Sequence, residues 1–387
     1  MTRTPFGLVL LLFAAGLGAA GQFAKISVLF DLIALRYPEA GTALGWLVSL
    51  LSLLGIVFGL LAGLVAARIG FRRLLLAALI LGAALSVIEA GLPPLPLFLA
   101  LRLIEGASHL AIVVAAPTLI AQISAARDLP VTMTLWSTFF GVAFAVTAWV
   151  GRPVALDSGP GAVFLAHGAY MAVIAGLVAW RLPGGEAPGT TPLRFGAVLA
   201  RHRAAYASPR IAAPALGWLF YTLTNVSLIT VLPGRLPMEA RDWVTGALPL
   251  AGLISSMTLG NLALRRFSPI AVVVAGFALA GVLALWLMVQ PGAPWIALAL
   301  LAALGLVQGG SFAAVPALNA DAEDRALANG ALAQMGNLGN TLGTPLLLLA
   351  AQRLGDAGLG AAVGLACGAA IVVHLALAQA RRRVPSG

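Results

Sequence analysis

The chain has 387 residues, of which 61% are hydrophobic and only 9% are charged. A soluble domain carries about 25% charged residues, so this chain has too few to cover a water-facing surface and is expected to face lipid. The formal net charge of +10 does not indicate nucleic-acid binding, because the basic residues occupy gaps between apolar stretches. This distribution is typical of the basic excess in the cytoplasmic loops of membrane proteins.

Twelve apolar stretches are long enough to span a bilayer as helices, which takes about 20 residues each. They are longer and more uniformly apolar than the strands of a membrane barrel, so we expect an all-α membrane protein. The predicted spans are 6–34, 42–67, 72–92, 95–123, 131–151, 160–182, 208–233, 243–265, 268–290, 294–318, 326–351 and 358–380.

The longest polar break, 183–207, divides the chain into two predicted six-helix bundles, residues 1–182 and 208–387. The break begins with a Gly- and Pro-containing stretch at 184–189 that predicts a flexible linker. It continues with Arg194, Arg201 and Arg203 among apolar residues, which favours a basic amphipathic helix on the inner leaflet.

The basic residues predict the orientation of the chain. With the N-terminus in the cytoplasm, 16 of the 23 basic residues fall in cytoplasmic segments and 5 in outer segments. Basic residues accumulate in cytoplasmic loops, so we expect both termini in the cytoplasm and the chain in the cell's inner membrane.

The segment between the second and third predicted spans carries a motif. Residues 63–73 have the sequence Gly-Leu-Val-Ala-Ala-Arg-Ile-Gly-Phe-Arg-Arg, which resembles the G-x-x-x-D-R-x-G-x-R-R motif of the major facilitator superfamily. The resemblance implies a conformational role for Gly63, Arg68, Gly70 and Arg72. In the family this loop holds the two halves in the outward-facing state. Ala67 replaces the family's acidic residue, so the ion pair made by that carboxylate is missing here.

A second match lies in the fourth predicted span. Residues 102–108, Arg-Leu-Ile-Glu-Gly-Ala-Ser, resemble the family's R-x-x-x-G-x-G pattern and imply a conformational role for Arg102. The fifth predicted span lacks the G-P-x-x-G-G run that is common in drug/proton antiporters. The resemblance implies twelve helices in two pseudo-symmetric bundles, transport by alternating access, and function as a monomer.

Two groups of polar residues in the first half are the strongest site candidates, because a charge at the centre of a membrane helix costs roughly 2.5–3.5 kcal/mol. Lys25 is the only lysine in the chain, and it shares a helix face with Gln22. Arg102, Glu105 and His109 share a face of the fourth span, and a carboxylate with an imidazole is suited to carrying protons.

Simpler interpretations remain open for these residues. Lys25 could extend to the outer surface, and Arg102 could form a structural pair with Glu105 while His109 bonds across helices. Asp31 and Glu89 lie near the outer ends of their spans, where solvation at the interface is expected.

The second half has no charged residue at mid-depth and offers neutral hydrogen-bonding groups instead. We predict substrate contacts from Tyr221, Asn225, Gln308 and Asn337, together with Gln22, Lys25 and His109 from the first half. Asparagine and threonine also join membrane helices structurally, so part of this set is expected to serve packing. His374 is interpreted as a packing residue with satisfied hydrogen bonds.

These observations predict a proton-coupled secondary transporter for a small organic solute, with protons exchanging at Glu105 and His109. The positive charges of Lys25 and Arg102 favour an anionic or zwitterionic solute. Export of amphipathic metabolites or drugs is the main alternative, and a membrane enzyme or lipid scramblase is a remote one. No enzymatic activity, cofactor or metal site is expected, because no nucleotide-binding loop, nucleophile motif or zinc-type cluster occurs in the sequence.

Overall fold

The computed structural model describes residues 3–184 and 195–383, except for the side chains of 60–65, 67, 130, 195–199, 201 and 322. Every regular element in these residues is helical. The chain divides into two compact units, Met1–Leu193 and Arg194–Gly387. The boundary between them falls inside the predicted linker 183–207, of which residues 185–194 lie outside the described part of the chain.

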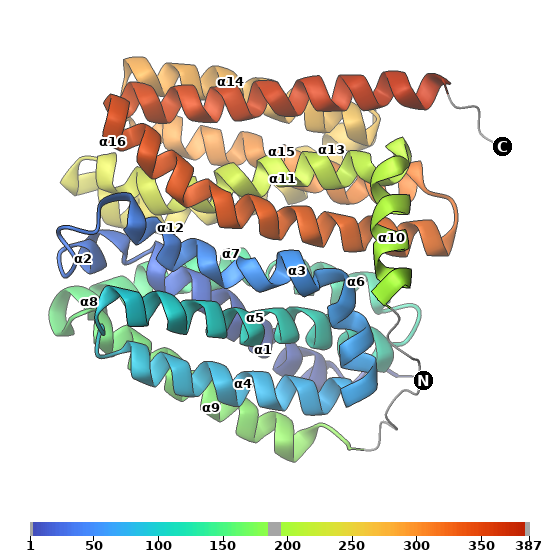
Figure 1. Cartoon of the computed structure of the whole chain (residues 1–387), viewed down its shortest axis with the longest axis horizontal. Coiled ribbons are helices and arrows are strands. Elements are labelled where there is room, and N and C mark those ends of the chain that lie inside the picture. The colour runs from blue at the N-terminus through green and yellow to red at the C-terminus, as the bar shows by residue number, and fades with distance from the viewer. Residues whose placement is uncertain (1–2, 185–194, 384–387) are drawn as a thin grey trace. The chain divides into compact units, whose positions relative to one another are not determined.

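The first unit contains six candidate membrane spans and several short helical segments. Its helices run side by side along the unit (Figure 1). They are α1 (Phe6–Ser27), α2 (Phe30–Ala34), η1 (Gly41–Gly45), α3 (Trp46–Ile69), α4 (Phe71–Glu89), α5 (Leu95–Ile123), α6 (Leu129–Ser137), α7 (Phe139–Val146), η2 (Thr147–Gly151), α8 (Arg152–Ser158) and α9 (Pro160–Arg181).

The second unit begins with α10, which packs against α11 and α16 and crosses the ends of these helices (Figure 1). Its elements are α10 (Phe195–Ala207), α11 (Pro209–Val231), η3 (Leu232–Arg235), α12 (Met238–Ser255), η4 (Ser256–Gly260), α13 (Asn261–Leu264), α14 (Pro269–Val289), α15 (Pro294–Leu318) and α16 (Ala322–Arg383).

Eleven helical segments of the described residues are long and apolar enough to cross a membrane, and the last of them has 61 residues, enough for two spans. The 62-residue α16 is interrupted at Gly355, whose φ of 63° and ψ of −148° are not helical. Because glycine lacks a Cβ, it adopts a positive φ without steric cost. The break yields six spans in each unit and confirms the predicted all-α membrane fold with twelve spans.

Three predicted spans differ in their limits. The first is broken at Val28 and Leu29, so that α2 forms a separate short helix. The fifth and the eighth each pass through a π-helical turn, η2 and η4, and the fifth continues to Ser158. A π-helical turn adds a residue to a helix without ending it, so a hydropathy pattern does not reveal it.

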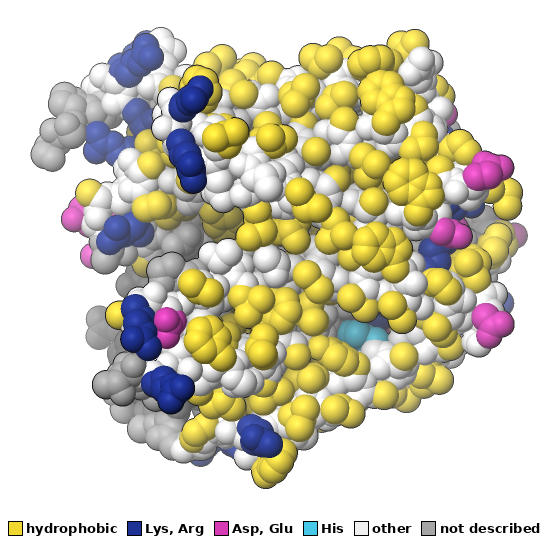
Figure 2. All heavy atoms as spheres, turned by 180° about the vertical axis from the view of Figure 1, so that it is seen from behind, with side chains coloured by type: hydrophobic (Ala, Val, Ile, Leu, Met, Phe, Trp, Pro, Cys, Tyr) yellow, Lys and Arg dark blue, Asp and Glu magenta, His cyan; other side chains and the backbone are white. Residues whose placement is uncertain are grey.

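The surface carries the polarity expected for a lipid-facing protein. Large apolar side chains such as Leu10, Ile80 and Leu285 are more than half exposed. Figure 2 shows an apolar band across each unit, with the Lys and Arg side chains of that face gathered mainly at one end of it. In the core of the first unit, small residues of α1 pack against α4, α5 and α9.

Candidate functional site

A cluster of buried charges lies where α1, α4 and α5 meet. The ammonium of Lys25 on α1 lies 2.8 Å from Glu105 Oε1 on α5 and 2.7 Å from Glu89 Oε2 on α4. Lys25 is 1% exposed and both carboxylates are fully buried. The ring of Phe164 on α9 covers the ammonium with its centroid 4.9 Å from Nζ, which favours the cation further.

Arg102 supplies the second cation of the cluster and is also fully buried. Its Nη1 pairs with the other oxygen of Glu105 and lies 3.9 Å from Glu89 Oε1. Its remaining donors reach the Leu47 carbonyl of α3 at 2.7 Å and the Gln22 carbonyl of α1 at 2.9 Å. Arg102 therefore connects three helices of the first unit, α1, α3 and α5.

The cluster has no formal net charge, because two cations face two carboxylates. Removing ions from water costs several kcal/mol each, and only close pairing offsets that cost. This balance corrects the sequence-based expectation of a positive field from Lys25 and Arg102, since Glu89 and Glu105 cancel it. It also corrects the expectation for Glu89, which is sealed in the interior rather than solvated at the interface.

A hydrogen-bonded chain that the sequence did not predict holds Lys25 in place. Lys25 Nζ donates to Ser86 Oγ at 2.6 Å, and Ser86 Oγ lies 2.7 Å from His167 Nδ1. His167 Nε2 lies 2.9 Å from the Gly18 carbonyl, which only accepts hydrogen bonds. Nε2 must therefore carry the proton of a neutral His167, so that Nδ1 accepts from the Ser86 hydroxyl.

Gln22, the polar neighbour of Lys25 on α1, is fully buried. Its amide nitrogen donates to Ser108 Oγ at 2.9 Å, and Ser108 in turn donates to the Ala78 carbonyl at 2.7 Å. Its Oε1 accepts no hydrogen bond within the described part of the chain. A Cβ on Gly82 would lie 2.7 Å from both Gln22 Nε2 and Ser108 Oγ, so glycine leaves the space that this pair occupies.

His109 lies beside the cluster without joining it. Its Nδ1 lies 3.0 Å from the Ala19 carbonyl, and its ring meets Phe23 edge to face at 5.0 Å between centroids. The arrangement matches the simpler interpretation of the sequence, an Arg102–Glu105 pair with His109 bonded across helices. His109 is 9% exposed, more than any charged member of the cluster.

Asp31 of α2 and Arg152 of α8 form a second ion pair in the first unit. Two guanidinium nitrogens of Arg152 each lie 2.7 Å from a different oxygen of Asp31. Arg152 is 3% exposed and Asp31 is 27% exposed. The pair fastens α2 to α8, and it corrects the expectation that Asp31 is simply solvated, although part of its side chain does reach the surface.

The turn of the 63–73 motif separates α3 from α4 at Gly70, which has a φ of 95°. Arg72 donates from Nε to the Leu182 carbonyl and from Nη2 to the Ala179 carbonyl, both at 2.8 Å. Cations stabilise helix C-termini by binding their open carbonyl groups, so Arg72 caps α9 within the same unit. Arg68 is exposed, and the space around Gly63 lies outside the description.

The polar residues predicted in the second unit are a hydrogen-bonded pair, Tyr221 and Gln308, and two half-buried asparagines. Tyr221 of α11 is 7% exposed and donates to Gln308 of α15 at 3.2 Å. Asn225 and Asn337 are half-buried, and Asn337 donates back to the Ala333 carbonyl of its own helix at 2.9 Å. No charged side chain is buried in the described residues of this unit.

Tyr221 belongs to a cluster of three aromatic side chains. Trp218 stacks on Tyr221 with 4.4 Å between ring centroids and meets Phe312 of α15 at 4.8 Å. Phe312 is 48% exposed. We call Trp218, Tyr221 and Phe312 the aromatic cluster below; with Gln308 beside it, it offers an apolar surface with a polar edge.

His374 of α16 is 1% exposed and packs beside Gly217 of α11. Neither ring nitrogen has a hydrogen-bond partner among the residues that the structure describes. The expectation that the ring nitrogens of His374 form hydrogen bonds is therefore wrong for the described residues. Close packing against α11 holds this ring in place.

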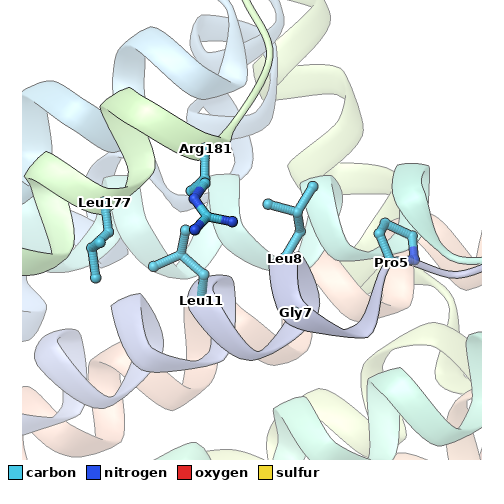
Figure 3. Close-up of a pocket in the computed structure, with 6 residues that line it drawn as sticks. All are labelled: Pro5, Gly7, Leu8, Leu11, Leu177 and Arg181. Atoms are coloured by element: carbon cyan, nitrogen blue, oxygen red, sulfur yellow. The ribbon is translucent and has the colours of Figure 1, made fainter.

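A pocket of about 350 Å³ lies apart from the charged cluster, at the N-terminal end of α1 and the C-terminal end of α9. Figure 3 shows Leu177 and Arg181 extending from α9 toward α1, and Leu8 and Leu11 extending from α1 toward α9, with the Arg181 guanidinium next to Leu11. The pocket is lined by Pro5, Gly7, Leu8, Leu11, Leu177 and Arg181. Its lining contains no carboxylate and no member of the charged cluster.

The sequence matches a known family over most of its length. Residues 8–344 match the family described as Major Facilitator Superfamily. The chain belongs to the Major Facilitator Superfamily. A search of the curated proteins returns no match to it. This membership confirms the resemblance seen in the 63–73 and 102–108 motifs.

Membership in the superfamily identifies the chain as a multi-pass membrane transporter. The twelve spans described above are the superfamily's fold, with the charged cluster in the first six and the aromatic cluster in the last six. Within the described residues, no group of three or more His, Cys, Asp or Glu side chains is placed to hold a metal ion.

Sequence reasoning missed Glu89, Ser86 and His167 as members of the cluster. Ser86 and Glu89 are three residues apart, so they lie on one face of α4. Two polar side chains on one face of an otherwise apolar span were a signal available in the sequence. No comparable signal marks His167, because the groups that it contacts, the Ser86 hydroxyl and the Gly18 carbonyl, lie on other helices.

Proposed function

We propose that this chain is a proton-coupled secondary transporter that moves a small organic solute across the inner membrane by alternating access. The observation that carries the proposal is the complete burial of Lys25, Glu89, Arg102 and Glu105 between helices of one unit. Ionic groups are expensive in a membrane protein and mark ion or substrate pathways. In this proposal the protein acts as a monomer with both termini in the cytoplasm.

The proposed proton site lies in the charged cluster. Binding one proton to a carboxylate changes the cluster from neutral to a net charge of +1, which weakens one of the ion pairs that hold the helices together. Proton binding would thereby bias the equilibrium between two conformations by the difference in its affinity for them. His109, beside the cluster, is the second group that we propose for proton exchange.

The proposed solute is neutral or zwitterionic, because the balanced cluster offers no excess positive charge to an anion. Gln22 and Lys25 are sealed in this conformation, so they would meet the solute only after the helices part. Asn225, Gln308 and Asn337 are half-buried, and we propose that they bind its polar groups. This assignment keeps the sequence-predicted set but places the accessible contacts in the second unit.

Export of an amphipathic metabolite is a second candidate function. The aromatic cluster favours it, because Trp218, Tyr221 and the exposed Phe312 form an apolar surface next to Gln308. Aromatic faces bind the apolar part of a ligand, while a few polar groups set its orientation.

The test begins with a thermal-shift screen of metabolites on the purified protein, because ligands that bind the folded form raise its apparent stability. Hits are then measured in proteoliposomes with an imposed pH gradient and a trapped pH indicator. The proposal expects the gradient to drive accumulation and protons to move with the solute. Solute movement that only reaches equilibrium, with no proton flux, would refute coupling.

The direction of transport separates the export candidate from uptake. Cells that lack the protein would accumulate an exported solute, whereas they would fail to take up an imported one. Trp218→Ala is expected to weaken solute binding in either case. Trp180→Ala is the matched control, because Trp180 is 70% exposed and stacks on Arg181 in the other unit.

A further inference from the structure

The two carboxylates of the charged cluster are unequally compensated. Glu105 accepts hydrogen bonds from Lys25 at 2.8 Å and from Arg102, one to each oxygen. Glu89 lies 2.7 Å from Lys25 Nζ, yet neither of its oxygens accepts a hydrogen bond of good geometry from the described residues. Arg102 lies 3.9 Å from Glu89. Glu89 therefore keeps the attraction of Lys25 at 2.7 Å but lacks the second close cation that compensates Glu105, so its burial is the less fully offset of the two.

Neutralising Glu89 and neutralising Glu105 have different consequences for the two cations of the cluster. If Glu89 is neutralised, Lys25 and Arg102 both keep their hydrogen bonds to Glu105. If Glu105 is neutralised, Arg102 keeps its hydrogen bonds to the Leu47 and Gln22 carbonyls, but its nearest carboxylate is then Glu89 at 3.9 Å, while Lys25 keeps Glu89 at 2.7 Å. A buried charge left without a close partner is strongly destabilising. The cluster therefore tolerates a proton on Glu89 far better than one on Glu105.

We propose that Glu89 binds and releases the transported proton, whereas Glu105 stays ionised as the permanent partner of both cations. This inference rests on the proposed function, and it replaces the sequence-based assignment of Glu105. The proton adds to a carboxylate oxygen of Glu89 from water and returns to water on the other side of the membrane. An O–H bond of a hydronium ion breaks as the O–H bond of Glu89 forms, release is the reverse, and no heavy-atom bond changes.

The geometry also indicates how protonation of Glu89 would change the packing of α4 against α1. A proton on Glu89 cancels the Lys25–Glu89 ion pair, which joins α1 to α4, and leaves the hydrogen bond from Lys25 to Ser86 as the remaining polar link of Lys25 to α4. The Lys25–Glu105 pair, which joins α1 to α5, stays intact. The contact of α4 with α1 would loosen while α1 and α5 move together. Proton binding would thus select a different packing of α4.

His167 acts in this scheme as a positioning residue. Its Nδ1 accepts from Ser86, which leaves the lone pairs of Ser86 Oγ to accept from Lys25. The ammonium is thereby held between the two carboxylates. The titratable and charged groups around Glu89 are Lys25 on α1, Arg102 and Glu105 on α5, and His167 on α9. A second cation from His167 would repel Lys25, so His167 must stay neutral for this arrangement.

The test is infrared difference spectroscopy of the full-length protein in liposomes, recorded between two bulk pH values. A carboxyl group that takes up a proton gives a C=O stretching band, and this measurement requires no solute. We expect the band in wild type, its loss in Glu89→Gln and its retention in Glu105→Asp, which keeps the charge. Glu239→Gln, at an exposed position of α12, controls for surface carboxyl groups.

A band that persists in Glu89→Gln, or that is lost in Glu105→Asp with Glu89 intact, would overturn the inference. His167→Gln tests positioning: it is expected to shift the pH midpoint of the band without removing it, and an unchanged midpoint would remove His167 from the scheme. Gradient-driven accumulation of a solute by wild type with no titrating buried carboxyl group would refute Glu89 but not proton coupling. Absence of gradient-driven accumulation would refute the proposed function itself.

Discussion

The ammonium of Lys25 on α1 lies 2.7 Å from a carboxylate oxygen of Glu89 on α4, and neither side chain is more than 1% exposed. The residues are 64 positions apart in the sequence, and each would carry an uncompensated charge without the other members of the cluster. Their pairing therefore depends on the packing of α1 and α4, and it makes the stability of the first unit sensitive to each charge.

Lys25→Met is expected to destabilise the protein by about 3–5 kcal/mol, because it leaves two buried carboxylates facing a single cation. The double variant Lys25→Met with Glu89→Gln should regain a large part of that loss, since it restores the charge balance. Thermal unfolding in detergent measures both. Arg73→Met, which removes an exposed cation, is the control, and equal losses in the single and double variants would contradict the pairing.

Gly106→Ala is expected to separate α5 from α3. A Cβ at this position would lie 2.6 Å from the Leu51 carbonyl oxygen, and overpacking of this kind costs about 1–3 kcal/mol. Gly176→Ala is the matched control, because its Cβ would have no neighbour within 4 Å and alanine favours a helix by about 1 kcal/mol. Opposite shifts in unfolding temperature are expected; equal shifts would argue against a close α3–α5 contact.

Arg72→Gln is expected to destabilise the C-terminal end of α9. The substitution removes two charge-assisted hydrogen bonds to the Ala179 and Leu182 carbonyls, each worth about 1.5–3 kcal/mol before relaxation. Faster amide hydrogen exchange in the last turn of α9 measures the effect. Arg73→Gln should leave this exchange unchanged, and the capping role fails if the two variants behave alike.

Tyr206→Phe is expected to loosen α10 from the rest of the second unit. Burial raises the pKa of the Tyr206 phenol to about 12, so at neutral pH the hydroxyl is protonated and donates to Gln334 Oε1 at 2.8 Å. Gln334 also contacts His202 of α10 at 3.0 Å. Loss of one such bond costs about 0.5–1.5 kcal/mol.

Hydrogen exchange across residues 200–207 measures that loosening. Tyr37→Phe is the control: it removes a hydroxyl that bonds to the Pro93 carbonyl in the first unit, so it should leave exchange in α10 unchanged. Unaltered exchange in Tyr206→Phe would show that other contacts hold α10.

Hydropathy alone determined the membrane class and the positions of most spans, because these depend on local composition and on the length needed to cross a bilayer. The same local signals placed Lys25, Arg102 and Glu105 in the interior. They did not place Glu89, which ends α4 and therefore looks interfacial by position along the chain.

The Arg102–Glu105 pair within one helix was foreseen as one interpretation of the sequence, but only the tertiary structure decided which charges pair between helices. The rotation of α4 about its axis and the depth at which its end packs against α1 and α5 put Glu89 beside Lys25. In the same way, α9 brings His167 to Ser86, and α8 brings Arg152 to Asp31. Each pairing joins residues more than 60 positions apart, and the energy that selects it arises from desolvation and helix packing, which no local pattern in the sequence records.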